Sequence, residues 1–245
     1  MATWALVTGA AKRIGLAIVS QLHSDGYNII IHYGNSANEA TQLKNKLNKL
    51  RPNSAETIQA NLAEPTAVSK LAQDILSSNI QLSVLVNNAS SFYPTPIGNT
   101  DFAQAQQLLT TNLLSPYLLA EQLRSLLSLH HGCIINMLDI HGKRPLKDHG
   151  LYSISKAALE MATLSLAQEL APSIRVNGVA PGAILWPEQS LEASQQAVLD
   201  AIPLAKLGQA EDIAKLISHL ISAPYISGQI IAVDGGRSAV GYKGA

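Results

Sequence analysis

Residues 4–33, WALVTGAAKRIGLAIVSQLHSDGYNIIIHY, contain the pattern that decides the fold. The apolar run at 4–7 predicts a strand that enters a turn at Gly9. Residues 14–26 predict a helix that ends at Gly26, and residues 27–33 predict a second strand. A strand, a helix and a second strand in this order are typical of the βαβ unit of a parallel sheet.

The same alternation continues along the rest of the chain, and the strands are continuous apolar runs, as a sheet covered on both faces requires. We expect a single α/β domain spanning 1–245, with a doubly wound parallel sheet of seven strands and helices on both faces. The segment 185–203 lies before the last helix and is our candidate for a substrate lid. The predicted strands are 4–9, 27–33, 55–62, 82–90, 133–138, 173–182 and 228–236, and the later helices are 36–50, 64–78, 101–132 (bent at Pro116), 151–171, 191–202 and 210–222.

Composition excludes several classes of protein. Apolar residues make up 47% of the 245 positions, and 17 basic residues balance 17 acidic ones, so neither a nucleic acid nor a membrane is an expected partner. Cys133 is the single cysteine, which excludes an intramolecular disulfide and fits a cytoplasmic location. The N-terminal residues lack a signal-peptide pattern, and no apolar run approaches membrane-spanning length. The seven histidines show no metal-ligand spacing, so we expect no metal.

The turn VTGAAKRIG between the first strand and the first helix predicts a phosphate site. Such a turn presents backbone N–H groups and the positive end of a helix dipole to an anion. Gly9 permits the tight turn, and Gly15 permits a close approach or close packing. A turn alone is a weak signal, but its position after the first strand of a doubly wound sheet is typical of dinucleotide binding.

The end of the second strand favours NADPH over NADH. An NAD site places an acid there to accept a hydrogen bond from the ribose, whereas residues 32–36, His-Tyr-Gly-Asn-Ser, contain none. The side chains of Asn35 and Ser36 can donate hydrogen bonds to a 2′-phosphate, and the cation of Arg13 would attract its negative charge. Asn35 and Ser36 could equally cap the following helix, and the two interpretations are compatible.

Tyr152 and Lys156 are spaced as neighbours on one helix face, and Asp139 precedes the tyrosine by thirteen residues. A reduction requires a proton donor, and a nearby ammonium lowers the pKa of a phenol while an ionised carboxylate raises it. The three groups therefore titrate as a coupled set. Asp139 could alternatively serve only as a capping acid after a strand.

Five features in order make the chain similar to the short-chain dehydrogenase/reductases. They are TGAAKRIG, the segment NNAS at 87–90, Asn112, the Tyr152–Lys156 pair and RVNGVAPG at 175–182. The resemblance covers essentially the whole chain. It implies a Rossmann-type fold and a homotetramer, or a dimer, in which paired long apolar helices form the interface.

Departures from the family's pattern narrow the resemblance to the pteridine reductases. Arg13 stands where the family usually has glycine, and Asp139 stands where it usually has the catalytic serine. The string SSFYPTP at 90–96 is also typical of this subgroup. Asn61 stands where relatives usually carry an aspartate that touches the adenine. The resemblance thus implies reduction of a pterin or folate C=N bond.

The resemblance also assigns individual roles. The ring of Phe92 would stack on the pterin, Arg13 would bridge pyrophosphate and pterin, and Asn112 would hold a water that resupplies Lys156. Catalysis is assigned to Asp139, Tyr152, Lys156 and Asn112. The expected substrate contacts are Arg13, Ser90, Phe92, Asp139, Tyr152, Leu185 and Trp186. The expected cofactor contacts are Gly9, Arg13, Ile14, Gly15, His32, Tyr33, Asn35, Ser36, Asn61, Leu62, Asn88, Ala89, Ser90, Tyr152, Lys156, Pro181 and Gly182.

Two alternatives remain open. A carbonyl reductase of the same fold could act on a ketone or a 3-oxoacyl substrate, although Asp139 and SSFYPTP argue against it. A non-catalytic NADPH sensor is a different class of protein, and it would have no need of Tyr152 as a proton donor.

Overall fold

A computed structural model describes residues 3–185 and 192–239 of the chain. Its centre is a seven-stranded sheet in the order β3-β2-β1-β4-β5-β6-β7, and every neighbouring pair is parallel. This confirms the predicted sheet. The strands are β1 (Trp4–Val7), β2 (Asn28–Tyr33), β3 (Ala55–Gln59), β4 (Leu82–Asn87), β5 (Cys133–Met137), β6 (Arg175–Pro181) and β7 (Ile230–Val233).

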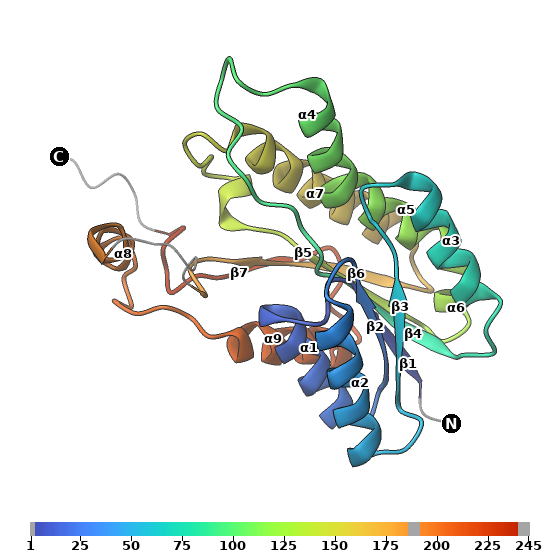
Figure 1. Cartoon of the computed structure of the whole chain (residues 1–245). Helices are drawn as coiled ribbons and strands as arrows, with labels where there is room; N and C mark the ends of the chain where they lie inside the picture. The colour runs from blue at the N-terminus through green and yellow to red at the C-terminus, as the bar shows by residue number, and fades with distance from the viewer. Residues whose placement is uncertain (1–2, 186–191, 240–245) are drawn as a thin grey trace.

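Helices cover both faces of the sheet (Figure 1). One face carries α1 (Arg13–Ser24), α2 (Ala37–Leu50) and α9 (Ala210–Ser222). The other face carries α3 (Pro65–Leu76), α4 (Phe102–Leu109), α5 (Ser115–Gln122), α6 (Arg124–Ser128) and α7 (Gly150–Glu169). The helix α8 (Glu192–Asp200) precedes α9. Within the described ranges, no helix is both long and apolar enough to span a membrane.

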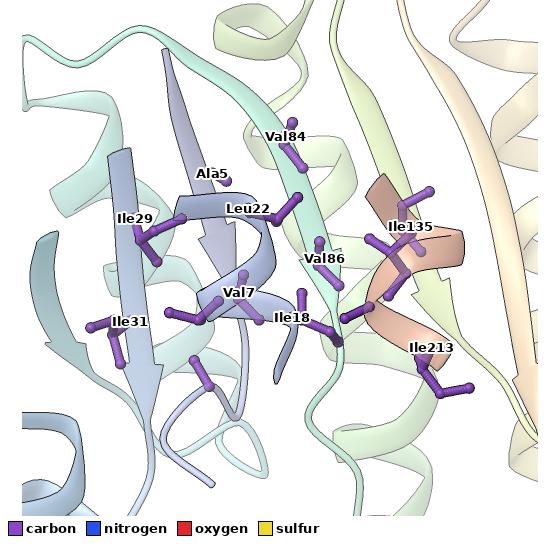
Figure 2. Close-up of a cluster of buried hydrophobic side chains, with 14 of the residues drawn as sticks. Ala5, Val7, Ile18, Leu22, Ile29, Ile31, Val84, Val86, Ile135 and Ile213 are labelled. Atoms are coloured by element: carbon purple, nitrogen blue, oxygen red, sulfur yellow. The ribbon is translucent and has the colours of Figure 1, made fainter. Parts of the chain in front are cut away.

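Strand β1 shows how the sheet joins two hydrophobic cores. Because successive side chains of a strand point to opposite faces, Ala5 and Val7 pack under α1 and α9, whereas Leu6 packs on the α3–α5 side. Figure 2 shows Val7 beside Ile18 of α1, with Ile213 of α9 nearby. All these side chains are fully buried, and each large one contributes roughly 1.5–3 kcal/mol to stability.

The helical region predicted at 101–132 is not one bent helix. After α4 the chain forms a π-helical turn, η1 (Thr110–Leu114), and then continues as α5 and α6. Pro116 lacks an N–H group and cannot donate to the carbonyl of Asn112 four residues earlier, which disfavours regular α-helix at this point. The wider turn accommodates the proline, and it also carries the buried side chain of Asn112.

The topology fixes where a site can form. Strand order reverses between β1 and β4, because the chain runs outward to β3 and then returns to the other side of β1. In such a sheet the crevice lies at the carboxyl ends of the strands at this reversal. The predicted functional segments follow the carboxyl ends of β1, β2, β4, β5 and β6.

Candidate active site

The turn after β1 requires its glycines. Gly9 has a φ of +59°, and a Cβ atom there would lie 3.0 Å from the Cα of Ala89. A Cβ atom on Gly15 would lie 2.3 Å from the carbonyl oxygen of Gly9. The first turn of α1 is therefore packed directly against the glycine turn, where its backbone can closely approach a ligand.

Asn88 and Thr8 join the β1 turn to the end of β4. The hydroxyl of Thr8 accepts hydrogen bonds from the backbone N–H groups of Asn88 at 2.9 Å and Ala89 at 3.0 Å. The amide of Asn88 donates to the carbonyl oxygens of Thr8 at 2.9 Å and Gly9 at 3.0 Å. Asn88, predicted to contact the cofactor, thus also braces the phosphate turn.

The side chain of His32 forms a hydrogen bond to the same turn. The N–H of Gly9 donates to its Nδ1 at 3.1 Å, so Nε2 carries the proton and donates to the carbonyl of Ala60 at 3.1 Å. Burial lowers the pKa of His32 to about 4, although the Ala60 hydrogen bond opposes this shift. The ring is neutral at physiological pH, and its predicted part in cofactor binding would act through Gly9.

Arg13 begins α1 with a φ of +53°, a left-handed conformation that side chains rarely adopt. The family's usual glycine at this position has a physical reason, since glycine adopts such a φ without steric cost. Backbone strain at a residue is typical of functional positions, so the strained φ of Arg13 indicates a role for its side chain. Arg13 is exposed, and it lines the cavity described next.

One cavity of about 700 Å³ brings half of the predicted site residues together. Of the predicted residues, it is lined by Arg13, Ile14, Asn88, Ser90, Phe92, Asp139, Tyr152, Lys156, Pro181, Gly182 and Leu185.

Tyr152 and Asp139 share a hydrogen bond in this cavity. The phenol donates to Oδ2 of Asp139 at 2.7 Å, and Oδ1 accepts from the backbone N–H of His141 at 2.8 Å. Burial, together with the charge of Asp139, raises the pKa of Tyr152 above its ordinary value. The phenol therefore retains its proton, and its role as the proton donor stays a prediction.

Lys156 lies one helical turn from Tyr152 and is almost completely buried. Its ammonium lies 5.7 Å from the centre of the Tyr152 ring and donates to the carbonyl of Met137 at 2.8 Å. Burial lowers the pKa of Lys156 to about 8, against the opposing charge of Asp139. Acid, phenol and amine thus occupy one site, as their spacing predicts.

Both polar atoms of the Asn112 side chain form hydrogen bonds, which join the loop after β4 to α7. Its Oδ1 accepts from the Ser91 N–H at 2.7 Å and the Ser90 hydroxyl at 3.1 Å. Its Nδ2 donates to the Ser91 carbonyl at 2.9 Å and to the hydroxyl of Ser155 at 3.1 Å. The side chain fixes the loop after β4 against α7, so any contact with a water near Lys156 stays a prediction.

Phe92 presents an aromatic ring to the cavity and is 53% exposed. It stacks on His149 with a centroid distance of 4.6 Å and an interplanar angle of 15°. Tyr152 meets the Phe92 ring edge-on at 4.7 Å. The Phe92 ring thus contacts both His149 and Tyr152 at the edge of the cavity, and its stacking on a ligand stays a prediction.

Other predicted residues lie outside the lining of this cavity. Ser36 is the N-cap residue of α2, yet its side chain makes no capping hydrogen bond. Asn61 accepts the Ala63 N–H at 3.1 Å. Trp186 lies outside the described residues, as does part of the predicted lid at 185–203, which stays a prediction. The predicted residues that do not line the cavity are Gly9, Gly15, His32, Tyr33, Asn35, Ser36, Asn61, Leu62, Ala89 and Asn112.

Sequence reasoning missed several contributors to the site. The N–H of His141 and the carbonyl of Met137 orient Asp139 and Lys156 through the backbone, which leaves no signal in residue types. His149, which backs Phe92, and Arg237, after β7, could have been found only by asking which residues follow each strand.

A glycine turn at the switch point, together with a buried tyrosine–lysine pair, defines the site of a nicotinamide-dependent oxidoreductase. The family model that matches residues 9–238 carries the description enoyl-(acyl carrier protein) reductase. The chain belongs to the short-chain dehydrogenase/reductase family.

Curated relatives from three organisms cover nearly the whole chain. Pteridine reductase 1 of Leishmania tarentolae is 37% identical, over 96% of both chains. A 3-oxoacyl-(acyl-carrier-protein) reductase of Staphylococcus aureus is 33% identical, over 95% of this chain and 96% of its own. Dihydromonapterin reductase of Klebsiella pneumoniae is 32% identical, over 95% of both. These relatives agree on the family but differ in the substrates that their names state.

Proposed function

We propose that this protein uses NADPH to reduce a pteridine C=N bond, converting a dihydropterin or dihydrofolate to its tetrahydro form. The observation that carries the proposal is a carboxylate, Asp139, bonded to the proton donor Tyr152 beside the half-exposed ring of Phe92. A planar, nitrogen-rich substrate suits both features, since it stacks on an aromatic ring and needs a proton on nitrogen. Two of the relatives are named as pterin reductases.

The residues at the switch point fit a dinucleotide. A Cβ atom on Gly15 would collide with the carbonyl oxygen of Gly9, so the glycine lets the start of α1 pack closely on the turn, where a helix N-terminus can bind a phosphate. Arg13 and the uncapped Ser36 side chain, with Asn35, would hold a 2′-phosphate. When bound, NADPH supplies the hydride that reaches the substrate carbon.

Side chains of the protein supply the proton that the substrate nitrogen receives. Tyr152 donates its proton to the substrate nitrogen, and the ammonium of Lys156 offsets the charge of the phenolate left behind. A solvent proton taken up by Asp139 can then cross the 2.7 Å hydrogen bond and restore the phenol. In total, the substrate gains one hydride and one proton, and NADPH leaves as NADP⁺.

A second candidate is the reduction of a 3-oxoacyl thioester. The Staphylococcus aureus relative, which is named as a 3-oxoacyl-(acyl-carrier-protein) reductase, favours it. In that reaction the proton would go to a carbonyl oxygen, and neither the stacking surface of Phe92 nor the acid at Asp139 would be required.

NADPH consumption at 340 nm separates the candidates. The purified protein should oxidise NADPH with dihydrobiopterin or dihydrofolate, and much more slowly with a 3-oxo ester. Preferred reduction of the ester would establish the second candidate. Consumption with none of the three substrates would leave a cofactor-binding protein without this activity.

Cofactor preference has a matched test at the end of β2. Asn35→Asp places an acid where a 2′-phosphate would lie, so the ratio of kcat/KM for NADPH to that for NADH should fall about tenfold or more. Asn45→Asp makes the same charge change at an exposed position further along α2 and should leave the ratio unchanged. Equal ratios in both variants would remove the phosphate assignment.

We further propose a homotetramer formed through α7. Ile154 and Met161 on this helix are 57% and 65% exposed, and Leu164 adds to the apolar surface. Large exposed apolar surfaces favour association. Sedimentation should give a mass of four chains, and Met161→Glu should shift the assembly to smaller species; a monomeric wild type would contradict the proposal.

A further inference from the structure

The segment that follows β7 contributes an arginine to the lining of the cavity, and the proposed reaction does not use this arginine. Arg237 lines the same cavity as Phe92, Asp139 and Tyr152. It is partly buried, and its sequence position follows the carboxyl end of β7.

The backbone around Arg237 is held in a fixed turn. The carboxylate of Asp234 accepts hydrogen bonds from the backbone N–H groups of Gly236 at 2.9 Å and Ser238 at 2.6 Å. The guanidinium of Arg144 donates to the carbonyl of Arg237 at 3.2 Å. The Cα of Arg237 is therefore positioned by the fold on both sides.

The charges that line the cavity are unbalanced. Arg13, Lys156 and Arg237 are cations, and Asp139 is the only carboxylate among the lining residues that the structure describes. Asp139 is engaged by Tyr152 and His141. In residues 3–185 and 192–239, no carboxylate lies within ion-pair distance, 4.0 Å, of the Arg237 guanidinium. A partly buried cation without an ion pair suits an anionic ligand.

The sheet places Arg237 away from the cofactor turn. Strands β4, β5 and β6 separate β1, which leads to Arg13, from β7, which leads to Arg237. Asp139 follows β5, so the reactive groups lie between the two arginines. With strands about 4.8 Å apart, the end of β7 lies roughly 10 Å from that of β5. An anion bound there must be on a substituent of the substrate, beyond the reacting ring.

We propose that Arg237 binds an anionic group, carboxylate or phosphate, on the side chain of the pterin substrate. This inference rests on the proposed pterin reduction and names its substrate class: pterins with a charged tail are preferred to pterins with a neutral one. Arg237 would then determine specificity and take no part in hydride or proton transfer.

Three substrates and three variants test the assignment. Dihydrofolate carries carboxylates, dihydroneopterin monophosphate carries a phosphate, and dihydrobiopterin has a neutral tail. We expect Arg237→Gln to lower kcat/KM about tenfold for one or both charged substrates, through KM, and to change it less than about twofold for dihydrobiopterin. Arg237→Lys, which keeps the charge, should restore most of the preference. Arg124→Gln removes an exposed cation on α6 and should change nothing.

The outcomes separate this inference from the function on which it rests. The substrate whose KM responds identifies the anion, and added salt should weaken the same preference. An equal loss for all three substrates, a raised KM for NADPH or no change in Arg237→Gln would overturn the role of Arg237 while pterin reduction stands. If the wild type reduces no pterin, the proposed function fails and this inference fails with it.

Discussion

The phenol of Tyr152 donates a 2.7 Å hydrogen bond to the carboxylate of Asp139, and both groups line the cavity that Phe92 faces. Burial and the neighbouring negative charge keep the proton on the phenol. In the proposed reaction this proton goes to the substrate nitrogen, whereas an alcohol-forming reaction could use a neutral hydroxyl at position 139.

Asp139→Asn should lower turnover by at least about tenfold, because it removes the group that returns a proton to Tyr152. The same change removes a negative charge, so the pKa of Tyr152 should fall. Phenolate absorbance during a pH titration measures this pKa after subtraction of the Tyr152→Phe signal. Asp74→Asn, on the exposed side of α3, is the matched control. Normal turnover in Asp139→Asn would contradict the relay.

The pH dependence of activity should follow Lys156. Burial lowers the pKa of its ammonium to about 8. The charged form is present below this pH and is lost as the pH rises through it, so kcat/KM for the pterin should fall above about pH 8. Because the Asp139 charge raises the pKa of Lys156, the break in Asp139→Asn should lie at lower pH. A profile that is flat to pH 10 would contradict the assignment.

Phe92→Leu should raise KM for the pterin about threefold to tenfold by removing the stacking surface. The free energy of unfolding should change little, because the Phe92 ring is 53% exposed. Phe102→Leu, at the 82% exposed first residue of α4, is the control and should leave KM unchanged. Equal KM values in wild type and Phe92→Leu would remove the main support for a planar substrate.

Arg13→Gly should separate stability from binding. Glycine adopts the observed φ of +53° without steric cost, so the free energy of unfolding should stay the same or rise by up to about 1 kcal/mol. KM for NADPH should rise about tenfold, since a charged hydrogen-bond donor is lost. Asn53→Gly relieves a similar φ of +57° in an exposed turn and should leave KM unchanged. Unaltered NADPH binding in Arg13→Gly would contradict the assignment of the Arg13 side chain to the cofactor.

The sheet and the reactive groups were predictable because their signals are local. Continuous apolar runs mark strands that are buried on both faces, and the structure contains all seven. The spacing of Tyr152 and Lys156 fixes them on one helix face, and both lie with Asp139 at the carboxyl ends of the strands.

Features that depend on distant parts of the chain were not predictable. The π-helical turn at Thr110–Leu114 is coupled to Pro116 and to contacts that Asn112 makes with Ser91 and Ser155. The role of His32 depends on its burial between Gly9 and Ala60. Arg237 is distant from Asp139 in sequence, and only the strand order brings it to the same cavity.

Isotope tracing tests the central claim most directly. NADPH that carries deuterium at the transferable position of its nicotinamide is incubated with the protein and a dihydropterin, and the product is analysed by mass spectrometry. We predict a tetrahydropterin that contains one deuterium on the carbon of the former C=N bond, formed by the wild type and reduced at least about tenfold in rate in Tyr152→Phe. An unlabelled pterin, together with deuterium in the alcohol formed from a 3-oxo ester supplied in competition, would contradict the account.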